Sequence, residues 1–265
     1  MARSIRDLSQ FKRILVFNFV SVAIVILAWE ILSRLVHSHY FPGPTDVARA
    51  LVSLSVSGDI EGIKLLDHAA TSIFRILTGF GVAALTAVPT GIVMGLRREI
   101  YESSKAVLEP LRFVPPIAWI PLAILLLSGY SRYIFLIWLG AFFPILLNTI
   151  AGFQRISRVL VDVARVFGAN RRAIIWKIAI PSALPEIMTG FRVGLGVGWM
   201  CIVAAEMIGG EVRGLGWLIL KNGVLLNVSG MIAGMIAVGV IGLVMNEGLL
   251  RAEKSLFKWR VEVRV

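Results

Sequence analysis

The sequence predicts an all-α protein that crosses a membrane several times. Of its 265 residues, 57% are hydrophobic and 16% are charged, whereas soluble domains average about 45–50% apolar and about 25% charged residues. The mean hydropathy is +0.83, and several apolar runs exceed the roughly 18 residues that mark a membrane span. Backbone polar groups must be satisfied internally in lipid, so these runs are expected to be helices. The period-2 alternation of a membrane barrel is absent from the sequence.

Six spans are predicted within a single transmembrane domain covering residues 1–265. The first apolar run follows four basic residues, as a secretory signal would. It continues past Trp29 and Glu30 without a small-residue cleavage site, so we interpret it as a retained span. The third run is rich in proline. The six spans are expected at about 14–36, 73–96, 111–128, 133–153, 187–208 and 231–250.

The charge distribution predicts the orientation of these spans. The net charge is +11, and 20 of the 27 Lys and Arg residues fall within 1–13, 97–112, 154–192 and 251–265. Six spans place all four segments on one side, which the positive-inside rule identifies as the cytoplasm. We therefore expect a membrane protein with both termini and the segment 154–186 in the cytoplasm. The basic charge is explained by topology, so nucleic acid is not expected as a partner.

No catalytic or metal-binding constellation is recognisable. Cys201 is the only cysteine, and His37, His39 and His68 are too scattered to indicate a metal site. The phosphate-binding G-x4-GK[ST] loop is missing, as are the H-E-x2-H and G-x-S-x-G patterns. The chain is therefore not expected to hydrolyse ATP, to bind a cofactor or to be an enzyme.

The longest cytoplasmic segment, 154–186, carries detailed local signals. Apolar residues recur at helical spacing on both sides of Gly168, which suits the left-handed end of a helix. Pro181 and Pro185 are predicted to stop a second helix and to set the entry into the fifth span. The segment is expected to form two short helices that present a basic, small-residue docking surface to a soluble partner.

This segment resembles the EAA loop of ABC-transporter permeases, whose pattern is E-A-A-x3-G-x9-I-x-L-P. Asp162-Val163-Ala164 stands for E-A-A, Gly168 for the glycine and Ile178-Ala179-Ile180-Pro181 for the ending. Asp replaces Glu, Val replaces the first Ala and Ile replaces Leu, while the spacing is kept. In that family the loop forms a coupling helix against the ATPase subunit. The resemblance implies an ATPase-coupling loop at Asp162, Ala164, Arg165, Gly168, Ala169, Ile178 and Pro181.

The resemblance extends over nearly the whole chain. The stretches HAATSIFRILTGFGVAALTAVPTGIVMGL, LRFVPPIAWIPLAILLLSGY and PSALPEIMTGFRVGLGVGWMCIVAAEMIGG, and the later RGLGWLI, are similar to permeases of nitrate, sulfonate and taurine importers. This implies a type I ABC importer permease fold and transport of a small oxyanion or organic acid, of the nitrate, sulfonate, taurine or bicarbonate class. It also implies a homodimer, two ATPase subunits that bind the ATP, and a separate substrate-binding protein outside. The alternative is a secondary transporter driven by an ion gradient, which would favour midplane charges and an internal repeat.

Several residues within the predicted spans have both a structural and a functional interpretation. Gly190, Gly194 and Gly198 form a face of small residues that favours close helix packing. The prolines of the third span either fit a kink to its neighbours or line a bent pathway, and both can hold. Ionisable and polar residues in spans are costly, so each either faces the pathway or completes a structural hydrogen-bond network. The candidates for the pathway or a gate are Pro115, Pro116, Pro121, Asn148 and Glu206.

Overall fold

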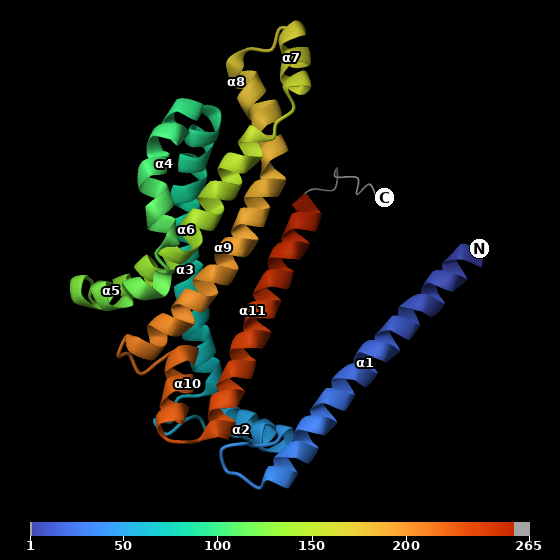
Figure 1. The fold of residues 1–265 in the computed structure, drawn as a ribbon, viewed down its shortest axis with the longest axis vertical. Coiled ribbons are helices and arrows are strands. Elements are labelled where there is room, and N and C mark those ends of the chain that lie inside the picture. Colours follow the sequence, from blue (N-terminus) through green and yellow to red (C-terminus); the bar gives the residue numbers. More distant parts are fainter. Residues whose placement is uncertain (1, 257–265) are drawn as a thin grey trace. The chain divides into compact units, whose positions relative to one another are not determined.

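The computed structural model of the protein describes the backbone of residues 2–256 and the side chains of residues 16–255. This part of the chain is helical and contains no strand, which confirms the all-α prediction (Figure 1). In chain order the elements are α1 (Ala2–Val36), α2 (Pro44–Val56), α3 (Leu65–Leu96), α4 (Arg98–Phe113), the 3-10 turn η1 (Pro116–Trp119), α5 (Ile120–Leu126), α6 (Tyr130–Gln154), α7 (Arg158–Val166), α8 (Arg171–Ile174), the π-helical turn η2 (Ile175–Ala179), α9 (Ile180–Ile208), α10 (Leu215–Val224) and α11 (Val228–Leu256).

Five helical segments are long and apolar enough to cross a membrane. They are Val16–Val36, Leu65–Leu96, Tyr130–Gln154, Arg171–Ile208 and Val228–Ser255. Four of them contain a predicted span in full. The fifth, Val16–Val36, begins two residues after the predicted first span, 14–36. The predicted third span, 111–128, falls on a bent pair instead. Arg98–Phe113 and Pro116–Leu126 meet at 85°, and they make a sixth span only if the pair is counted as one.

The break in this pair follows from its prolines. Val114 and Pro115 both have extended backbone conformations, with ψ of 114° and 134°. A residue that precedes proline is pushed out of the helical region, and Val114 and Pro115 both precede one. Pro116 opens the 3-10 turn, and Pro121 lies in the first turn of α5, where the missing N–H is not needed. The prolines thus end one helix and begin another.

The chain forms two compact units. The first comprises the residues up to Leu65 together with Leu218–Ile236. Within it, the Glu30 carboxylate accepts hydrogen bonds from the backbone N–H of Thr45 at 3.2 Å and from its hydroxyl at 3.0 Å. Lys221 forms an ion pair with Glu61 at 3.0 Å. The contacts of Glu30 hold the first turn of α2 against α1. The ion pair of Lys221 holds the last turn of α10 against the loop after α2.

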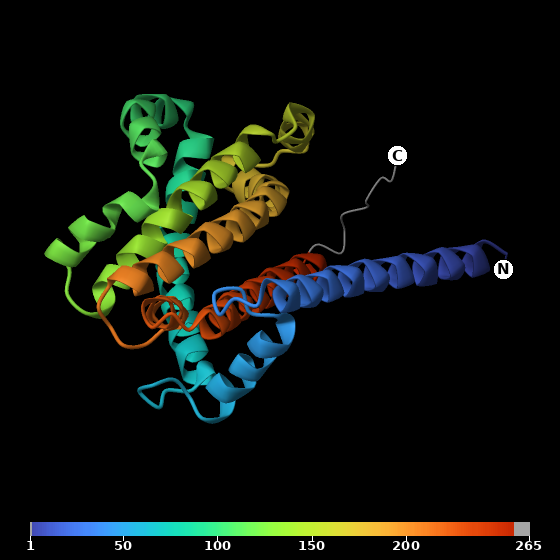
Figure 2. The same cartoon turned by 60° about the horizontal axis from the view of Figure 1, so that its bottom comes forward.

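The second unit, Leu66–Trp217 with the chain from Ala237, contains the long pair α6 and α9, which lie side by side (Figures 1 and 2). The glycine face of α9 makes this contact. A Cβ on Gly194 would lie 3.0 Å from the carbonyl oxygen of Ala141, and one on Gly190 would lie 2.9 Å from Cβ of Asn148. Gly91 of α3 approaches Thr149 of α6 in the same way. The packing interpretation of the glycine face is therefore confirmed.

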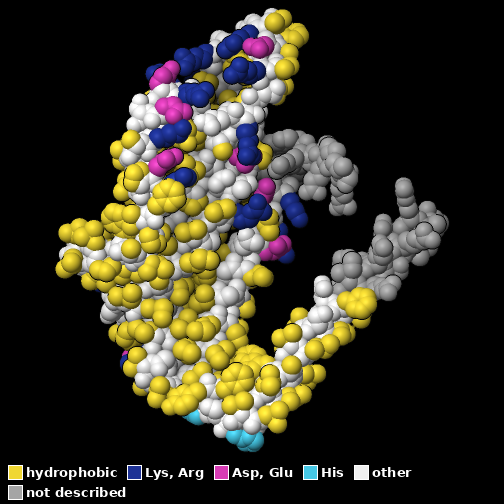
Figure 3. Space-filling view, in the orientation of Figure 1, with side chains coloured by type: hydrophobic (Ala, Val, Ile, Leu, Met, Phe, Trp, Pro, Cys, Tyr) yellow, Lys and Arg dark blue, Asp and Glu magenta, His cyan; other side chains and the backbone are white. Residues whose placement is uncertain are grey.

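Charged side chains are unevenly distributed over the second unit. Lys, Arg, Asp and Glu gather around α4, α7 and α8 and near the end of α11, whereas hydrophobic side chains predominate on the remaining surface of this unit in Figure 3. The ends of α3 and α6 and the start of α9 meet at this charged region. We call it the loop end of the second unit.

The second helix of the loop continues into the membrane, contrary to the prediction that Pro181 and Pro185 stop it. Helical backbone runs without a break from Arg171 to Ile208. Pro181 lies in the first turn of α9, directly after the π-helical turn, and Pro185 lies inside α9. A π turn widens the hydrogen-bond ladder, and proline is tolerated in membrane helices whose neighbours support the freed backbone. The predicted loop 154–186 is correspondingly shorter, and its last seven residues belong to α9.

Candidate functional site

The turn between α7 and α8 is built by Gly168 and Asn170. Gly168 has φ of +78°, and its N–H donates to the carbonyl of Arg165 at 2.9 Å. The N–H of Ala169 donates to the carbonyl of Ala164, also at 2.9 Å, which completes a Schellman ending of α7. Asn170 is extended, and its Oδ1 accepts a hydrogen bond from the N–H of Ala173 at 2.8 Å, so it caps α8. The left-handed conformation predicted for Gly168 is confirmed, and Asn170 begins the next helix as its N-cap.

The short helix α7 has two chemically different faces. One face, which we call the α7 apolar face, is uncovered: the side chains of Val166 and Phe167 are 85% and 86% exposed. The opposite face carries charged residues that turn toward the ends of α3 and α6. The α7 apolar face consists of Val159, Leu160, Val163, Val166 and Phe167, with Phe167 at the helix end.

The residues assigned by the EAA resemblance are divided between these faces and the turn. Asp162, Arg165 and Ala169 lie on the inward side, and Asp162 pairs with Arg165 at 3.4 Å. Ala164 and Gly168 form the helix end described above. Ile178 belongs to the π-helical turn and Pro181 to the first turn of α9. Asp162 and Arg165 are themselves 67% exposed, and the most exposed apolar side chains of α7 and its end, Val166 and Phe167, are not part of the motif.

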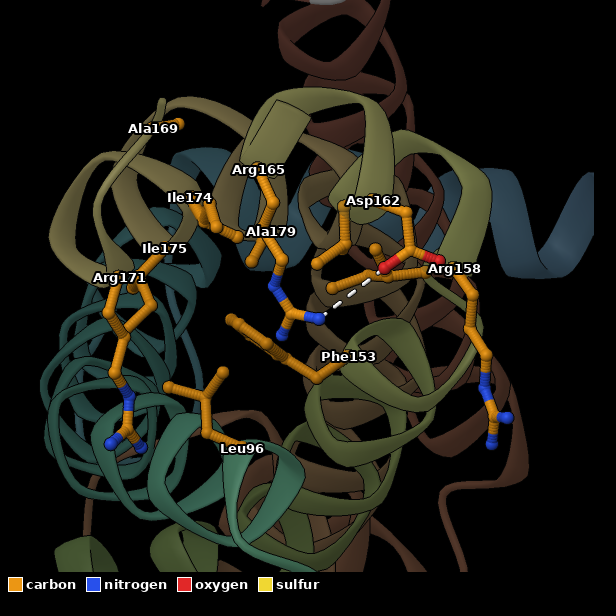
Figure 4. A pocket seen from close by; sticks show the side chains of 12 residues that line it. Leu96, Phe153, Arg158, Asp162, Arg165, Ala169, Arg171, Ile174, Ile175 and Ala179 are labelled. Atoms are coloured by element: carbon orange, nitrogen blue, oxygen red, sulfur yellow. Dashed lines mark hydrogen bonds and ion pairs between the residues drawn. The ribbon is translucent and has the colours of Figure 1, made fainter. Parts of the chain in front are cut away.

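The inward face of α7 borders an open cavity of about 730 Å³, which we call the loop cavity (Figure 4). Arg165 points into it from α7, while Leu96 and Phe153 lie at its base. Arg158 and Arg171 stand on opposite sides of it. The lining residues are Leu96, Phe153, Ile156, Arg158, Val161, Asp162, Arg165, Ala169, Arg171, Ile174, Ile175 and Ala179.

A second cavity joins two of the predicted pathway residues. Pro116 and Asn148 both line a groove of about 440 Å³ between the break after α4 and the helices α6 and α9. Asn148 is half-buried, and its side-chain N–H donates to the carbonyl of Pro144 at 2.8 Å. We call this cavity the Pro116 groove. Its lining is otherwise apolar except for one cation, and it comprises Arg112, Phe113, Val114, Pro116, Leu139, Gly140, Phe143, Pro144, Leu147, Asn148, Val193 and Val197.

The other predicted pathway residues do not line this groove. Pro115 sits at the break beside Pro116, and Pro121 lies on the exposed surface of α5. Thr149, which follows Asn148, is fully buried against Gly91, and its hydroxyl donates to the carbonyl of Ile145 at 2.7 Å. Glu206 lies in a separate, buried cluster at the far end of α9.

Glu206 is held by a dense set of donors. Its carboxylate accepts hydrogen bonds from the Ser72 hydroxyl at 2.8 Å, from Nη1 of Arg75 at 2.9 Å and from the N–H of Gly216 at 3.0 Å. Its side chain is 0% exposed and that of Arg75 is 3% exposed. These three donors, one of which is the buried cation Arg75, satisfy the Glu206 carboxylate within the protein. The geometry favours the structural interpretation of Glu206.

The same cluster fixes the segment between α9 and α10. Arg75 also pairs with Glu211 and donates to the carbonyl of Arg213 at 2.9 Å. Its guanidinium carbon lies 4.0 Å from the centroid of the Tyr133 ring. Ser72 accepts a hydrogen bond from the N–H of Leu215 at 2.9 Å. We call these residues, with Glu206 and Gly216, the Glu206 cluster.

Two features of this cluster are absent from the sequence-based picture. Arg75 lies near the start of the predicted second span, where a long basic side chain can reach the membrane surface, but the structure buries it. The sequence offers one signal for the pair, since two opposite charges placed within apolar spans are each costly unless they meet. The glycines of the stretch RGLGWLI have a role as well, because a Cβ on Gly214 would overlap the Glu206 carboxylate.

Comparison with known proteins places these features in context. The family model described as "Binding-protein-dependent transport system inner membrane component" matches residues 87–249. The chain is 38% identical to a putative ABC transporter permease protein of Methanocaldococcus jannaschii, over 90% of each chain. It is 32% identical to a taurine transport system permease protein of Escherichia coli, over 92% of this chain and 90% of that one. It is also 32% identical to a nitrate import permease protein of Synechocystis, over 86% and 84%.

Proposed function

The chain belongs to the binding-protein-dependent transport system inner membrane components, which are the permease subunits of ABC importers. On this basis we propose a role in transport for each of its main surfaces. The α7 apolar face docks an ABC ATPase subunit. The Pro116 groove forms half of the pathway for a small anion, and a second copy of the chain supplies the other half. ATP is bound by the ATPase, and the permease itself needs no cofactor.

The exposure of the α7 apolar face is the observation that carries this proposal. Four large apolar side chains on the nine-residue helix α7, and Phe167 directly after it, lie uncovered in a region otherwise rich in charge. Uncovered apolar patches with a charged surround are typical of protein–protein contacts. The Schellman ending at Gly168 holds Phe167 at the tip of the helix, where a partner groove can receive it.

The continuous helix from Arg171 to Ile208 connects the docking surface to the pathway. Its 38 residues correspond to about 57 Å at the ~1.5 Å rise of an α-helix. The same helix carries Val193 and Val197 into the Pro116 groove. A movement of the ATPase at α7 therefore reaches the groove through one helix, supported along its length by α6.

A second copy of the chain is proposed because one copy encloses the groove incompletely. The groove lies at the break before α5, and α5 exposes large apolar side chains such as Leu125 and Leu126 at 82% and 72%. Two copies that meet along this side would close a central pathway, and each copy would bind one ATPase subunit. A substrate-binding protein would deliver the solute at the opposite end.

The proposed orientation places the loop end and both termini in the cytoplasm. It rests on the concentration of Lys and Arg in the segments at and near the loop, in agreement with the positive-inside rule. A membrane-impermeant thiol reagent should then fail to label Arg171→Cys in intact cells of a Cys201→Ala background.

The solute is proposed to be a small oxyanion or an organic sulfonate. Two relatives carry the names of nitrate and taurine transport. The lining of the Pro116 groove adds an observation from this chain, because Arg112 is its one charged residue and no Asp or Glu of the described chain is among its lining residues. A pathway with a single cation and apolar walls favours an anion over a cation.

A charge on the α7 apolar face is expected to weaken docking of the ATPase. Phe167→Asp should lower the affinity for the ATPase by about thirtyfold, since burial of a phenylalanine contributes about 2 kcal/mol and each ~1.4 kcal/mol is tenfold. The measurements are co-purification of the ATPase and ATP-driven uptake of nitrate and taurine in proteoliposomes. Asn170→Asp is the matched control, because it adds the same charge to the loop but retains the cap of α8. Equal loss in both variants would contradict the docking assignment.

Gly168 is expected to tolerate asparagine better than leucine. A leucine at φ of +78° costs about 1–2 kcal/mol, whereas asparagine adopts this conformation more readily. No atom lies within 4 Å of a Cβ built on Gly168, so the chain alone has room for either side chain. Gly168→Leu should weaken ATPase co-purification roughly five- to thirtyfold, and Gly168→Asn should weaken it less. Wild-type docking in a well-expressed Gly168→Leu protein would disprove the requirement.

A further inference from the structure

The loop cavity combines an apolar base with unpaired positive charge. Leu96 and Phe153, at the ends of two membrane helices, form its base, while Arg158 and Arg171 stand at its sides (Figure 4). Among residues 16–255 neither of these two arginines has an ion-pair partner. The third arginine, Arg165, is paired with Asp162. The cavity therefore offers two uncompensated cations above a hydrophobic floor.

The position of the cavity along the helices matches the level of lipid headgroups. Its base consists of the last residue of α3, a residue near the end of α6 and the π-helical turn before α9. Trp176, beside the lining residue Ile175, is 64% exposed. Tryptophan is enriched where a membrane helix meets the polar interface. The cavity thus lies at the ends of three membrane helices, where the boundary between hydrocarbon and water is expected.

We propose that the loop cavity binds an anionic phospholipid, with the headgroup attracted by Arg158 and Arg171 at the two sides of the cavity and the upper part of an acyl chain against Leu96 and Phe153. Basic pockets at the ends of membrane helices are suited to anionic headgroups. The volume of about 730 Å³ lies within the about 300–1,000 Å³ that small-ligand sites occupy. Because phosphate alone would leave the apolar base uncovered, an amphiphile satisfies the site better than a free anion.

The proposal goes beyond ATPase docking and depends on the proposed orientation only for the choice of the cytoplasmic leaflet. The lipid would fill the space between α7 and the membrane helices, on the side of α7 that faces away from the docking surface. A bound lipid would therefore support α7 on the side that faces the membrane helices. The anionic lipid content of the membrane would then affect how firmly α7 is held.

The test is native mass spectrometry of the affinity-purified permease with its co-purifying subunits. The complex is titrated with phosphatidylglycerol, with phosphatidylcholine and with inorganic phosphate. Phosphatidylglycerol should bind more tightly than phosphatidylcholine to the wild type. Arg158→Gln/Arg171→Gln should weaken this binding by about five- to thirtyfold, as expected for the loss of two charges near an anionic headgroup.

Arg97→Gln/Arg172→Gln is the matched control. It removes the same charge at the same end of the helices, but neither residue lines the cavity. This variant should retain the wild-type preference for phosphatidylglycerol. Equal weakening in both double variants would overturn the proposal, as would the absence of a preference in the wild type. Displacement of phosphatidylglycerol by millimolar inorganic phosphate would show that the site takes a free anion and would also overturn it. Lipid binding and ATPase co-purification are measured separately, so a failure of either assignment can be recognised.

Discussion

Arg75→Met is expected to lower the free energy of unfolding by about 3–5 kcal/mol. Removal of one partner from a buried ion pair leaves the other charge uncompensated, and this loss exceeds the net contribution of the pair itself. Here the side chains of Arg75 and Glu206 are 3% and 0% exposed. The substitution also removes the donor to the carbonyl of Arg213, so the segment between α9 and α10 should loosen. Thermal unfolding of the detergent-solubilised protein would measure the effect.

Two companion variants separate charge from packing in this cluster. Arg75→Met/Glu206→Gln removes both charges of the pair and should recover part of the lost stability. Arg49→Met breaks an exposed pair with Asp46, whose contribution is at most about 1 kcal/mol, and should leave the unfolding temperature nearly unchanged. If Arg75→Met were as stable as Arg49→Met, the Glu206 cluster would not hold this end of the second unit.

Gly216→Ala is the second substitution with a large expected effect. A Cβ at this position would overlap the carbonyl oxygen of Val203 and lie 2.8 Å from Cβ of Glu206. Overpacking against rigid backbone costs about 1–3 kcal/mol, and this contact belongs at the upper end because a carbonyl in a helix cannot rotate away. The N–H of Gly216 would also be displaced from the Glu206 carboxylate. The loss of stability should appear in the same thermal measurement.

Gly239→Ala is the matched control for this substitution. It places the same methyl group in a helix, at a position with no atom within 4 Å. Alanine is favoured over glycine in helices by about 0.5–1 kcal/mol, so Gly239→Ala should be neutral or slightly stabilising. A destabilisation of equal size in the two variants would mean that the contact with Val203 is not responsible.

The membrane class and the turn at Gly168 could be predicted because their signals are local. Apolar runs identify spans wherever the lipid requirement holds, and five predicted spans coincide with helices. The glycine at 168 could be assigned a left-handed ending because few other residues adopt it at low cost. Each inference depends on residues close together in the chain and on a rule that has few exceptions.

The proline signals were ambiguous because the effect of proline depends on its surroundings. Pro115 and Pro116 break a helix, whereas Pro181 and Pro185 continue one. The difference lies in the adjoining π-helical turn and in the packing of α9 on α6, neither of which can be inferred from the dipeptide around a proline. The side of α7 that faces inward could not be predicted from the sequence either, because it depends on where the ends of α3 and α6 lie in space.

The contact between Arg75 and Glu206 could not be predicted from local pattern. The two residues are 131 positions apart, and each has an ordinary explanation near the end of a span. Sequence reasoning could assign Glu206 to a gate or to a network. Only the placement of Ser72 and Gly216 beside it favours the network.

The π-helical turn before α9 has a mechanical consequence. Within Ile175–Ala179 the regular hydrogen-bond ladder is widened, and Pro181 and Pro185 each lack an N–H a few residues later. The connection between the docking helix and the membrane is thus more compliant than the glycine-packed stretch that follows. For an ATPase docked on α7 as proposed, the stiffness of this joint would set how much of a displacement of α7 is lost in bending before it reaches α9.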